Sequence, residues 1–135
     1  MVAIAGPESA YDPTAKGAHI LNFSPADRVK YAPYDCGGYL SFGYWQIFQG
    51  VHHALLQAAT GSTDPCQWRT YLFIPLNNAY IARQVWQAQG FGAWTAYNNG
   101  SYIAHKPAAT LAVDAVLGPP PPRRAPPPPG GGAPR

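Results

Sequence analysis

The sequence predicts a mainly α-helical domain in which several short helices are joined by long aromatic loops and a small β-hairpin. Apolar residues recur at intervals of three and four along 47–58 and 79–86, which is typical of amphipathic helices. Ser24, directly before a proline, is typical of the start of another, shorter helix. The segment 31–44 is rich in Tyr and Gly, which favours a loop with a hairpin.

The amino-terminal part is expected to contain short elements separated by turns. Residues 1–6 are apolar and predict the end of a helix or a buried strand, which Pro7 then interrupts. Residues 8–17 contain several turn formers. The helix that begins after Ser24 is expected to end near Lys30.

The central and carboxyl-terminal parts carry the stronger helical signals. Glycine is the usual residue just beyond a helix, and three helices are expected to end this way: from about Trp45 to Gly61, from about Asn78 to Gly90 and from Ala109 to Gly118. Asn77 or Asn78 is expected to cap the second of them. A proline-punctuated apolar segment, 62–76, separates the first two.

A boundary after residue 118 divides the chain into two parts. Residues 1–118 have the length and the apolar content of one folded domain. Residues 119–135 contain nine prolines and three arginines but no large apolar residue, so they cannot bury enough surface to offset the entropy of ordering. We therefore expect a domain over 1–118 followed by a disordered Pro/Gly/Arg-rich tail over 119–135.

The distribution of charge gives no sign of a nucleic-acid surface. The formal net charge is +3, but acidic and basic residues balance within 1–118, and Arg123, Arg124 and Arg135 supply the excess. A fold without a basic stripe is not expected to bind nucleic acid. No stretch is apolar for long enough to predict membrane insertion.

The cysteines and the first residues bear on the cellular compartment. Cys36 and Cys66 are too few for a disulfide scaffold or a zinc site, and they pair only if the protein is exported, which their spacing leaves open. Residues 1–9 have no basic region and only a short apolar run, so no signal peptide is visible. An extracellular role therefore requires another export route or a removed upstream segment.

Glu8 is the chain's only glutamate and its best candidate for acid–base chemistry. Apolar and aromatic neighbours would desolvate its carboxylate and raise its pKa, which keeps the proton available near neutral pH, as a general acid requires. The alternative is a surface glutamate that caps a turn. Two other stretches, 41–47 and 96–100, are ordinary turns when each is taken alone.

Taken together and in order, these three stretches resemble the motifs of a known family. The pair Glu8-Ser9, the Ser-x-Gly-x-x-Gln-Ile pattern at 41–47 and the Ala-Tyr-Asn-x-Gly pattern at 96–100 resemble the SLT-type lytic transglycosylases of the lysozyme superfamily. The stretch 88–102 is most similar to the version found in phage tail-associated and actinobacterial wall-degrading proteins. The resemblance spans about residues 2–103, including 77–82, which resembles the helix leading into the Tyr motif.

The resemblance implies a lysozyme-like α+β fold and a role for each matching residue. Glu8 matches the catalytic acid/base, and Ser9 matches the serine that helps to position it or the sugar. Gly43 matches a position where the glycan approaches the backbone closely. The remaining matches are to residues that line the cleft, orient the sugar or its acetamido group, or lie near the carboxyl: Ser41, Gln46, Tyr97 and Asn98.

The number of carboxylates bears on the reaction. Glycosidases that work with paired carboxylates need a second Asp or Glu. Asp35 is the better candidate here, because Asp12 precedes a proline and is expected to form a turn. If neither serves, Glu8 must act alone. Cleavage of the MurNAc-GlcNAc β-1,4 bond of peptidoglycan would then leave a 1,6-anhydro product, as in lytic transglycosylases. A hydrolytic lysozyme is the alternative outcome.

Other constellations are weaker. The four histidines (His19, His52, His53 and His105) show no metal-ligand spacing, and no metal or cofactor is expected. The adjacent pair His52-His53 is expected to be solvated, with its two rings pointing in different directions. The aromatic residues that could either stack on sugars or lie in the core are Tyr39, Tyr44, Trp45 and Trp94.

The short segment before Glu8 keeps a second function class open. Only seven residues precede Glu8, and Pro7 is adjacent, so weak anchoring of the carboxyl would cost activity. The alternative is a weakly active peptidoglycan-binding or structural module of a phage tail. A protein-interaction module that works through the proline-rich tail is a third class. The expected partner is the peptidoglycan glycan strand, and the expected location is the cell wall or a virion, within a larger wall-associated or tail protein.

Overall fold

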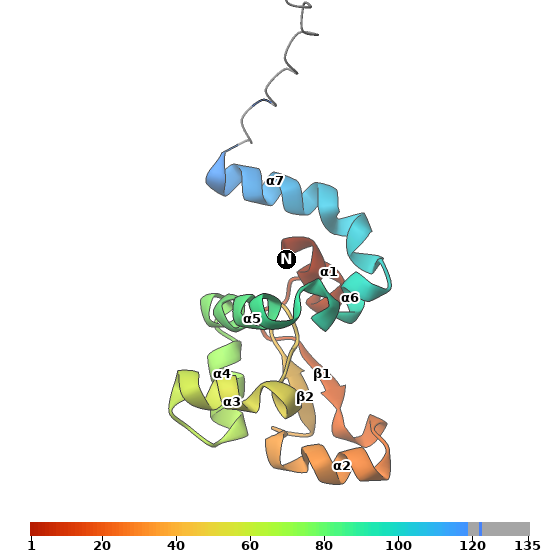
Figure 1. The fold of residues 1–135 in the computed structure, drawn as a ribbon, viewed down its shortest axis with the longest axis vertical. Helices are drawn as coiled ribbons and strands as arrows, with labels where there is room; N and C mark the ends of the chain where they lie inside the picture. The colour runs from red at the N-terminus through yellow and green to blue at the C-terminus, as the bar shows by residue number, and fades with distance from the viewer. Residues whose placement is uncertain (119–121, 123–135) are drawn as a thin grey trace, which may run out of the picture.

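A computed structural model describes residues 1–118 and residue 122 (Figure 1). The expected tail over 119–135 therefore lies almost wholly outside the described residues. The described helices are α1 (Val2–Ser9), α2 (Pro25–Tyr31), α3 (Gln49–Thr60), α4 (Pro65–Leu72), α5 (Pro75–Gln89), α6 (Thr95–Asn98) and α7 (Lys106–Leu117). Short 3-10 turns are η1 (Ile20–Asn22), η2 (Ala32–Tyr34), η3 (Phe91–Ala93) and η4 (Ser101–His105), and the strands are β1 (Lys16–His19), β2 (Tyr39–Phe42) and β3 (Ile47–Phe48).

The three strands form a small antiparallel sheet in the order β1-β2-β3. Gly17 of β1 pairs with Ser41, and Ser41 in turn pairs with Phe48 of β3. Figure 1 shows α1, α6 and α7 at one end of the molecule and α2 at the other, with the sheet between them. The mainly helical class with a small β-sheet, predicted from the sequence, is confirmed.

The core joins α1, α3, α4 and α5 to the sheet. Its centre is formed by large side chains with almost no exposed surface, contributed by α1, β2, β3, α3, α4 and α5: Ile4, Leu40, Phe42, Ile47, Leu56, Leu72, Ile81 and Val85. Burial of such side chains stabilises each by about 1.5–3 kcal/mol relative to leaving it in water. Ile4 anchors α1 from one end of the fold, and Trp94 covers the same cluster from the connection between α5 and α6.

Several local expectations are confirmed. The Ser24 hydroxyl accepts a hydrogen bond from the Asp27 amide at the start of α2, with Pro25 in the first turn. Gly61 ends α3 in the left-handed region, with φ of 68°. α5 ends at Gly90 and α7 ends at Gly118.

The expectation of a helix from Trp45 is wrong. Ile47 and Phe48 form β3, and α3 begins only at Gln49. Gln46 has φ of 47°, which is incompatible with a right-handed helix. Its side-chain amide donates to the carbonyls of Ala15 and Gly43, at 3.1 and 3.0 Å, and these bonds stabilise the turn between β2 and β3.

Two further boundaries differ from the sequence prediction. Pro7 lies inside α1, which continues to Ser9, because only the amide-to-Ala3 bond is lost and the short helix is held by packing. The segment 62–76 contains α4, which the Asp64 carboxylate caps at the Cys66 amide, 2.9 Å away. Short helices of this kind need a cap and a packing face rather than a long periodic pattern.

Neither Asn77 nor Asn78 caps α5, which begins at Pro75 after Ile74. Asn78 is instead fully buried one turn into the helix. Its amide group donates to the carbonyls of Phe42 and Leu72, both at 2.9 Å, and its oxygen accepts from the Trp45 amide at 3.1 Å. Asn78 therefore fastens α5 to the hairpin.

Cys36 and Cys66 form a disulfide that spans a sequence separation of 30 residues. Cys36 is buried just before β2, and Cys66 lies in the first turn of α4. The bond ties the sheet to the helices on one side of it. Of the described helices, none combines the length and the apolar character that a bilayer span requires.

Candidate active site

Glu8 lies at the carboxyl end of α1, where the chain turns toward the sheet. The turn is made by Ala10, which adopts the left-handed conformation (φ 51°) and donates its amide to the Gly6 carbonyl. The Ser9 hydroxyl donates to the carbonyl of Ala5 at 2.9 Å. Gly6 faces the His105 ring so closely that a Cβ there would lie 2.3 Å from Nδ1. Tight packing against η4 therefore sets the position of Glu8.

The Glu8 carboxyl is half-buried and, within residues 1–118, is held by a single hydrogen bond. Its Oε1 accepts from the backbone amide of Ala96 at 3.1 Å, across 88 positions of sequence. Burial raises the pKa of Glu8 because it penalises the charged form, and the Ala96 amide offsets part of this rise. A carboxyl in such surroundings keeps its proton to a higher pH than a solvated glutamate, which suits a general acid.

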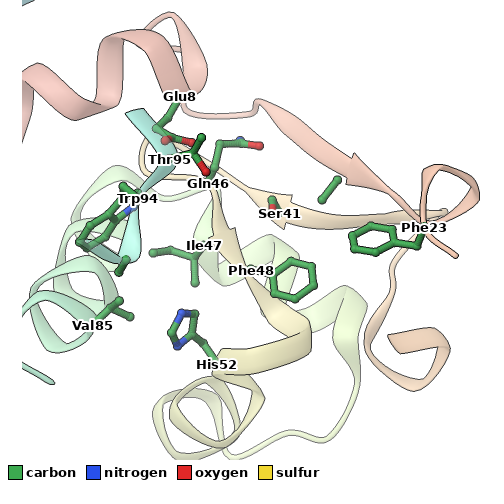
Figure 2. Close-up of a pocket in the computed structure, with 12 residues that line it drawn as sticks. Glu8, Phe23, Ser41, Gln46, Ile47, Phe48, His52, Val85, Trp94 and Thr95 are labelled. Carbon is green, nitrogen blue, oxygen red and sulfur yellow. The ribbon is translucent and has the colours of Figure 1, made fainter. Parts of the chain in front are cut away.

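The carboxyl opens into a cleft of about 370 Å³ between the α1 end of the molecule and the sheet (Figure 2). One wall, which we call the helical wall, consists of Glu8, Val85 of α5 and residues 93–95, where η3 meets α6. The other, which we call the sheet wall, consists of the three strands with Phe23 and the first turn of α3. The residues that line the cleft are Glu8, Ala18, Phe23, Ser41, Gln46, Ile47, Phe48, His52, Val85, Ala93, Trp94 and Thr95.

The polar side chains of the cleft fall into two groups. In the first group, the side chains are already hydrogen-bonded: the Gln46 amide donates to backbone carbonyls, and the Trp94 indole N–H donates to the Trp45 carbonyl at 2.9 Å. Ser41, His52 and Thr95 make no side-chain hydrogen bond within residues 1–118. Their polar atoms are therefore available to a ligand, together with the second oxygen of Glu8.

Three of the predicted site residues meet in this cleft: Glu8, Ser41 and Gln46. Ser9 and Gly43 do not line it. Ser9 is buried and bonded within α1. Gly43 faces Asn78, whose Nδ2 would lie 2.1 Å from a Cβ at position 43, so the glycine serves close packing of the hairpin on α5.

Tyr97 and Asn98 also lie outside the cleft. The Tyr97 ring stands in a row with Phe91 and Tyr102, at centroid distances of 5.3 and 5.1 Å. These three rings line a separate groove with Met1 and Lys106. The Asn98 amide donates to the Gly92 carbonyl at 2.9 Å. Within the Ala-Tyr-Asn-x-Gly motif, the backbone amide of Ala96 contacts the Glu8 carboxyl, whereas the Tyr97 phenol does not.

Among the described residues, Glu8 is the only carboxylic acid that lines the cleft. Asp12 accepts from the amide and the hydroxyl of Thr14, at 2.8 and 2.9 Å, in a turn. Asp35 accepts from the Gly38 amide at 3.1 Å, also in a turn. Neither aspartate lines the cleft with Glu8.

Several cleft residues were not predicted from the sequence. Thr95 directly precedes the Ala-Tyr-Asn motif. The motif indicated this part of the chain, but nothing in the sequence indicated that Thr95 itself lines the cleft. Phe23, Phe48 and Val85 carry no local signal. His52 was predicted to be solvated with His53, but it is half-buried in the cleft, whereas His53 stacks on Tyr34 at 4.2 Å. The two rings do point to different places.

The four aromatic candidates for sugar stacking are mostly core residues. Trp94 is 5% exposed, so only a small part of its side chain lines the cleft. Tyr39 and Trp45 pack against the core. Phe23 and Phe48, stacked at 6.1 Å, are the aromatic rings on the sheet wall. In the part of the chain that the structure describes, no three His, Cys, Asp or Glu side chains gather as metal ligands.

Comparison of the chain with protein-family models, with curated proteins and with solved structures finds no match. The functional conclusion therefore depends on the residues of the cleft and their geometry.

Proposed function

We propose that the protein is a glycosidase that cleaves the glycan strands of peptidoglycan, with Glu8 as its single acid/base. The observation that carries the proposal is a lone, half-buried carboxyl with a raised pKa in an open cleft. Aromatic and apolar side chains with a few unengaged polar groups line the rest of this cleft, as is typical of sites for uncharged, ring-shaped ligands.

The single carboxyl favours a lytic transglycosylase over a hydrolase. Glu8 would donate its proton to the glycosidic oxygen as the bond from MurNAc C1 to that oxygen breaks. The ionised Glu8 would then take the proton of the MurNAc 6-hydroxyl while that oxygen attacks C1. The product is a 1,6-anhydro sugar, and no second carboxylate is needed to activate water, unlike in paired-carboxylate enzymes.

The disulfide supports a location outside the cytoplasm. Bonds such as Cys36–Cys66 persist in oxidising compartments and are rare in reducing ones. Peptidoglycan lies in such a compartment, so the proposed substrate and the redox chemistry agree. We accordingly place the protein at the cell wall or on a virion that attacks it.

The test uses purified peptidoglycan and the Glu8→Gln variant. Because glutamine can still accept from the Ala96 amide, the variant should fold normally, while its rate of cleavage should fall at least about 100-fold. Asp12→Asn and Asp35→Asn are matched carboxyl controls that should cleave normally. Equal clearing by wild type and Glu8→Gln would contradict the proposal, and retained binding without cleavage by the wild type would indicate a binding module.

The same digest separates the two reaction outcomes. Mass spectrometry of fragments released in ¹⁸O-labelled water should show anhydro ends without the label. Reducing ends that carry the label would instead indicate a hydrolytic lysozyme.

A further inference from the structure

Two grooves at the α1 end of the molecule adjoin each other and lie outside the Glu8 cleft. One, which we call the aromatic groove, has a volume of about 270 Å³ and is lined by α1 and by the row of rings Phe91, Tyr97 and Tyr102. The other, which we call the α7 groove, has a volume of about 460 Å³ and reaches Val113 of α7. The residues that line both grooves are Met1, Ala3 and Lys106. The two grooves are therefore continuous.

The α7 groove leads toward the point where the proline-rich tail begins. Figure 1 shows α7 at the same end of the molecule as α1 and α6. Val113 lies about 8 Å along the helix axis from Gly118, where α7 ends. Gly118 has φ of 81° and ψ of 159°, a conformation that ends the helix and that residues with a Cβ rarely adopt. The chain can therefore leave the axis of α7 here, close to one end of the continuous grooves.

The tail is long enough to reach the aromatic groove. α7 has 12 residues and is therefore about 18 Å long, with Lys106 at its far end. A polyproline II segment advances about 3.1 Å per residue, so Pro126 can lie about 25 Å from Gly118. The run Pro126–Pro129 can therefore pass Lys106 and reach the rings. The run Pro119–Pro122 extends only about 12 Å from Gly118 and cannot.

The polar groups of the aromatic groove suit a run of prolines. Proline has no N–H, so such a run presents apolar rings and carbonyl acceptors but no backbone donor. The groove offers donors that make no hydrogen bond within residues 1–118: the phenols of Tyr97 and Tyr102 and the ammonium of Lys106. The rest of its described lining is aromatic or aliphatic, and Tyr97 is 39% exposed, so its ring is accessible.

The charges of the grooves favour the prolines of the tail over its arginines. No acidic side chain is among the described residues that line either groove, and Lys106 is a cation. A proline run also loses little backbone entropy on binding, because the ring already fixes φ. The tail can therefore bind here although it has no apolar core of its own.

We propose that the aromatic groove is a binding surface for the chain's own proline-rich tail, with Pro126–Pro129 held in polyproline II conformation against the rings. Aromatic-lined grooves recognise proline-rich segments in this way in several kinds of protein domain. Because the tail is tethered, its effective concentration at the groove is high, so even weak contacts keep it bound. This interaction goes beyond the proposed function and does not depend on it.

NMR spectroscopy of the 135-residue chain tests the proposal. We expect NOEs from the ring protons of Pro126–Pro129 to the rings of Tyr97 and Tyr102. In the variant P126S/P127S/P128S/P129S, these NOEs should be lost and the amide signals of the ring row should shift. The matched control is P119S/P120S/P121S/P122S, which changes as many prolines in the same tail and should keep the NOEs and the signals of the parent.

A change in the groove gives the reciprocal test. Tyr97→Ala should remove the NOEs between the tail and Tyr102, because it takes away the ring between Phe91 and Tyr102. Tyr80→Ala is the control, since Tyr80 is an exposed tyrosine of α5 that lines neither groove. It should leave the NOEs unchanged. Thermal melts check the fold of both variants, and the serine variants alter only the tail if Tyr97→Ala disturbs the row.

Three results would overturn the proposal. The first is a parent without these NOEs, or equal signal changes in the two serine variants. The second is a loss of the NOEs on about tenfold dilution, which would indicate the tail of a second copy. The third is an N-acetylglucosamine tetrasaccharide that shifts the signals of the ring row equally in the parent and in P126S/P127S/P128S/P129S, which would indicate a glycan surface. None of these measurements requires cleavage, so failure of the proposed reaction would leave the tail interaction standing.

Discussion

The two walls of the cleft are stabilised in different ways. The sheet wall is stabilised by specific bonds. Asn78 makes three hydrogen bonds to the hairpin and α4, and Gln46 makes two. The disulfide joins Cys36, just before β2, to α4. The helical wall depends mainly on packing. Among the described residues Glu8 has one hydrogen-bond partner, and α1 is positioned by the contact of Gly6 with His105.

The sheet wall is thus a rigid frame, whereas the helical wall holds a carboxyl whose pKa depends on its surroundings. Side-chain-to-backbone bonds fix the hairpin in one conformation, which suits recognition of a ligand's shape. A carboxyl with many donors around it would have a lowered pKa, so a single donor and partial burial are what let Glu8 keep its proton. Changes to the sheet wall should therefore cost mainly stability, and changes to the helical wall mainly activity.

Loss of the disulfide should have the largest effect on the frame. Replacing both Cys36 and Cys66 by serine should lower the free energy of unfolding by about 3.5 kcal/mol, because the unfolded chain regains the entropy of a loop of this length. Urea denaturation measures the change, and reduced wild type is the control. A loss below about 1 kcal/mol would mean that the sheet wall is held without the cross-link.

Asn78→Ala should lower the free energy of unfolding by about 3 kcal/mol, since it leaves the Trp45 amide and the Phe42 and Leu72 carbonyls without their partner. The neighbouring Asn77 makes no side-chain hydrogen bond within residues 1–118. Asn77→Ala should therefore change stability by less than about 0.5 kcal/mol in the same urea titration. Similar losses for the two variants would show that the hairpin does not depend on Asn78.

On the helical wall, Gly6→Ala should displace α1 from His105 and cost about 2 kcal/mol of stability. Because Glu8 moves with α1, the rate of cleavage should fall by a larger factor than the loss of folded protein explains. The His105→Ala change in the same chain should restore space for the new methyl and recover part of the activity. No recovery in the double variant would mean that the Gly6 contact does not position Glu8.

The raised pKa of Glu8 predicts a smaller, pH-dependent effect on stability. The folded state binds the proton more tightly than the unfolded state, so this stabilisation is complete below the unfolded pKa and is lost as pH rises through the folded pKa. Glu8→Gln should therefore melt slightly above wild type at pH 7 and with no advantage at about pH 3.5. Melting curves across this range test the sign, and a growing advantage toward acid pH would contradict it.

The smallest effect is expected for Tyr97→Phe, which removes a hydroxyl outside the cleft. The rate of cleavage should stay within about twofold of wild type, as for a surface change of under about 0.5 kcal/mol. A loss of 100-fold or more would show that this phenol reaches the carboxyl during the reaction, and the helical wall would then include it.

Local sequence patterns predicted those features that depend on neighbouring residues. The Ser24 cap, the helix ends at Gly61 and Gly90 and the mainly helical class each follow from a few consecutive positions. Patterns failed where a distant partner sets the conformation. The stretch 45–48 has helical spacing but forms a turn and a strand, because Gln46 bonds to Ala15 and Asn78 bonds to Trp45, 31 and 33 positions away.

By itself the sequence determined that this chain has one glutamate, a neutral part over 1–118 and two cysteines, and it brought Glu8, Ser41 and Gln46 forward as candidates for one site. Only the tertiary structure decided that the Ala96 amide holds Glu8, that the cysteines pair and that His52 enters the cleft. The reason is that composition and spacing record which groups are present and how they repeat locally. Burial, pKa and bonding partners arise from residues that meet only after the chain has folded.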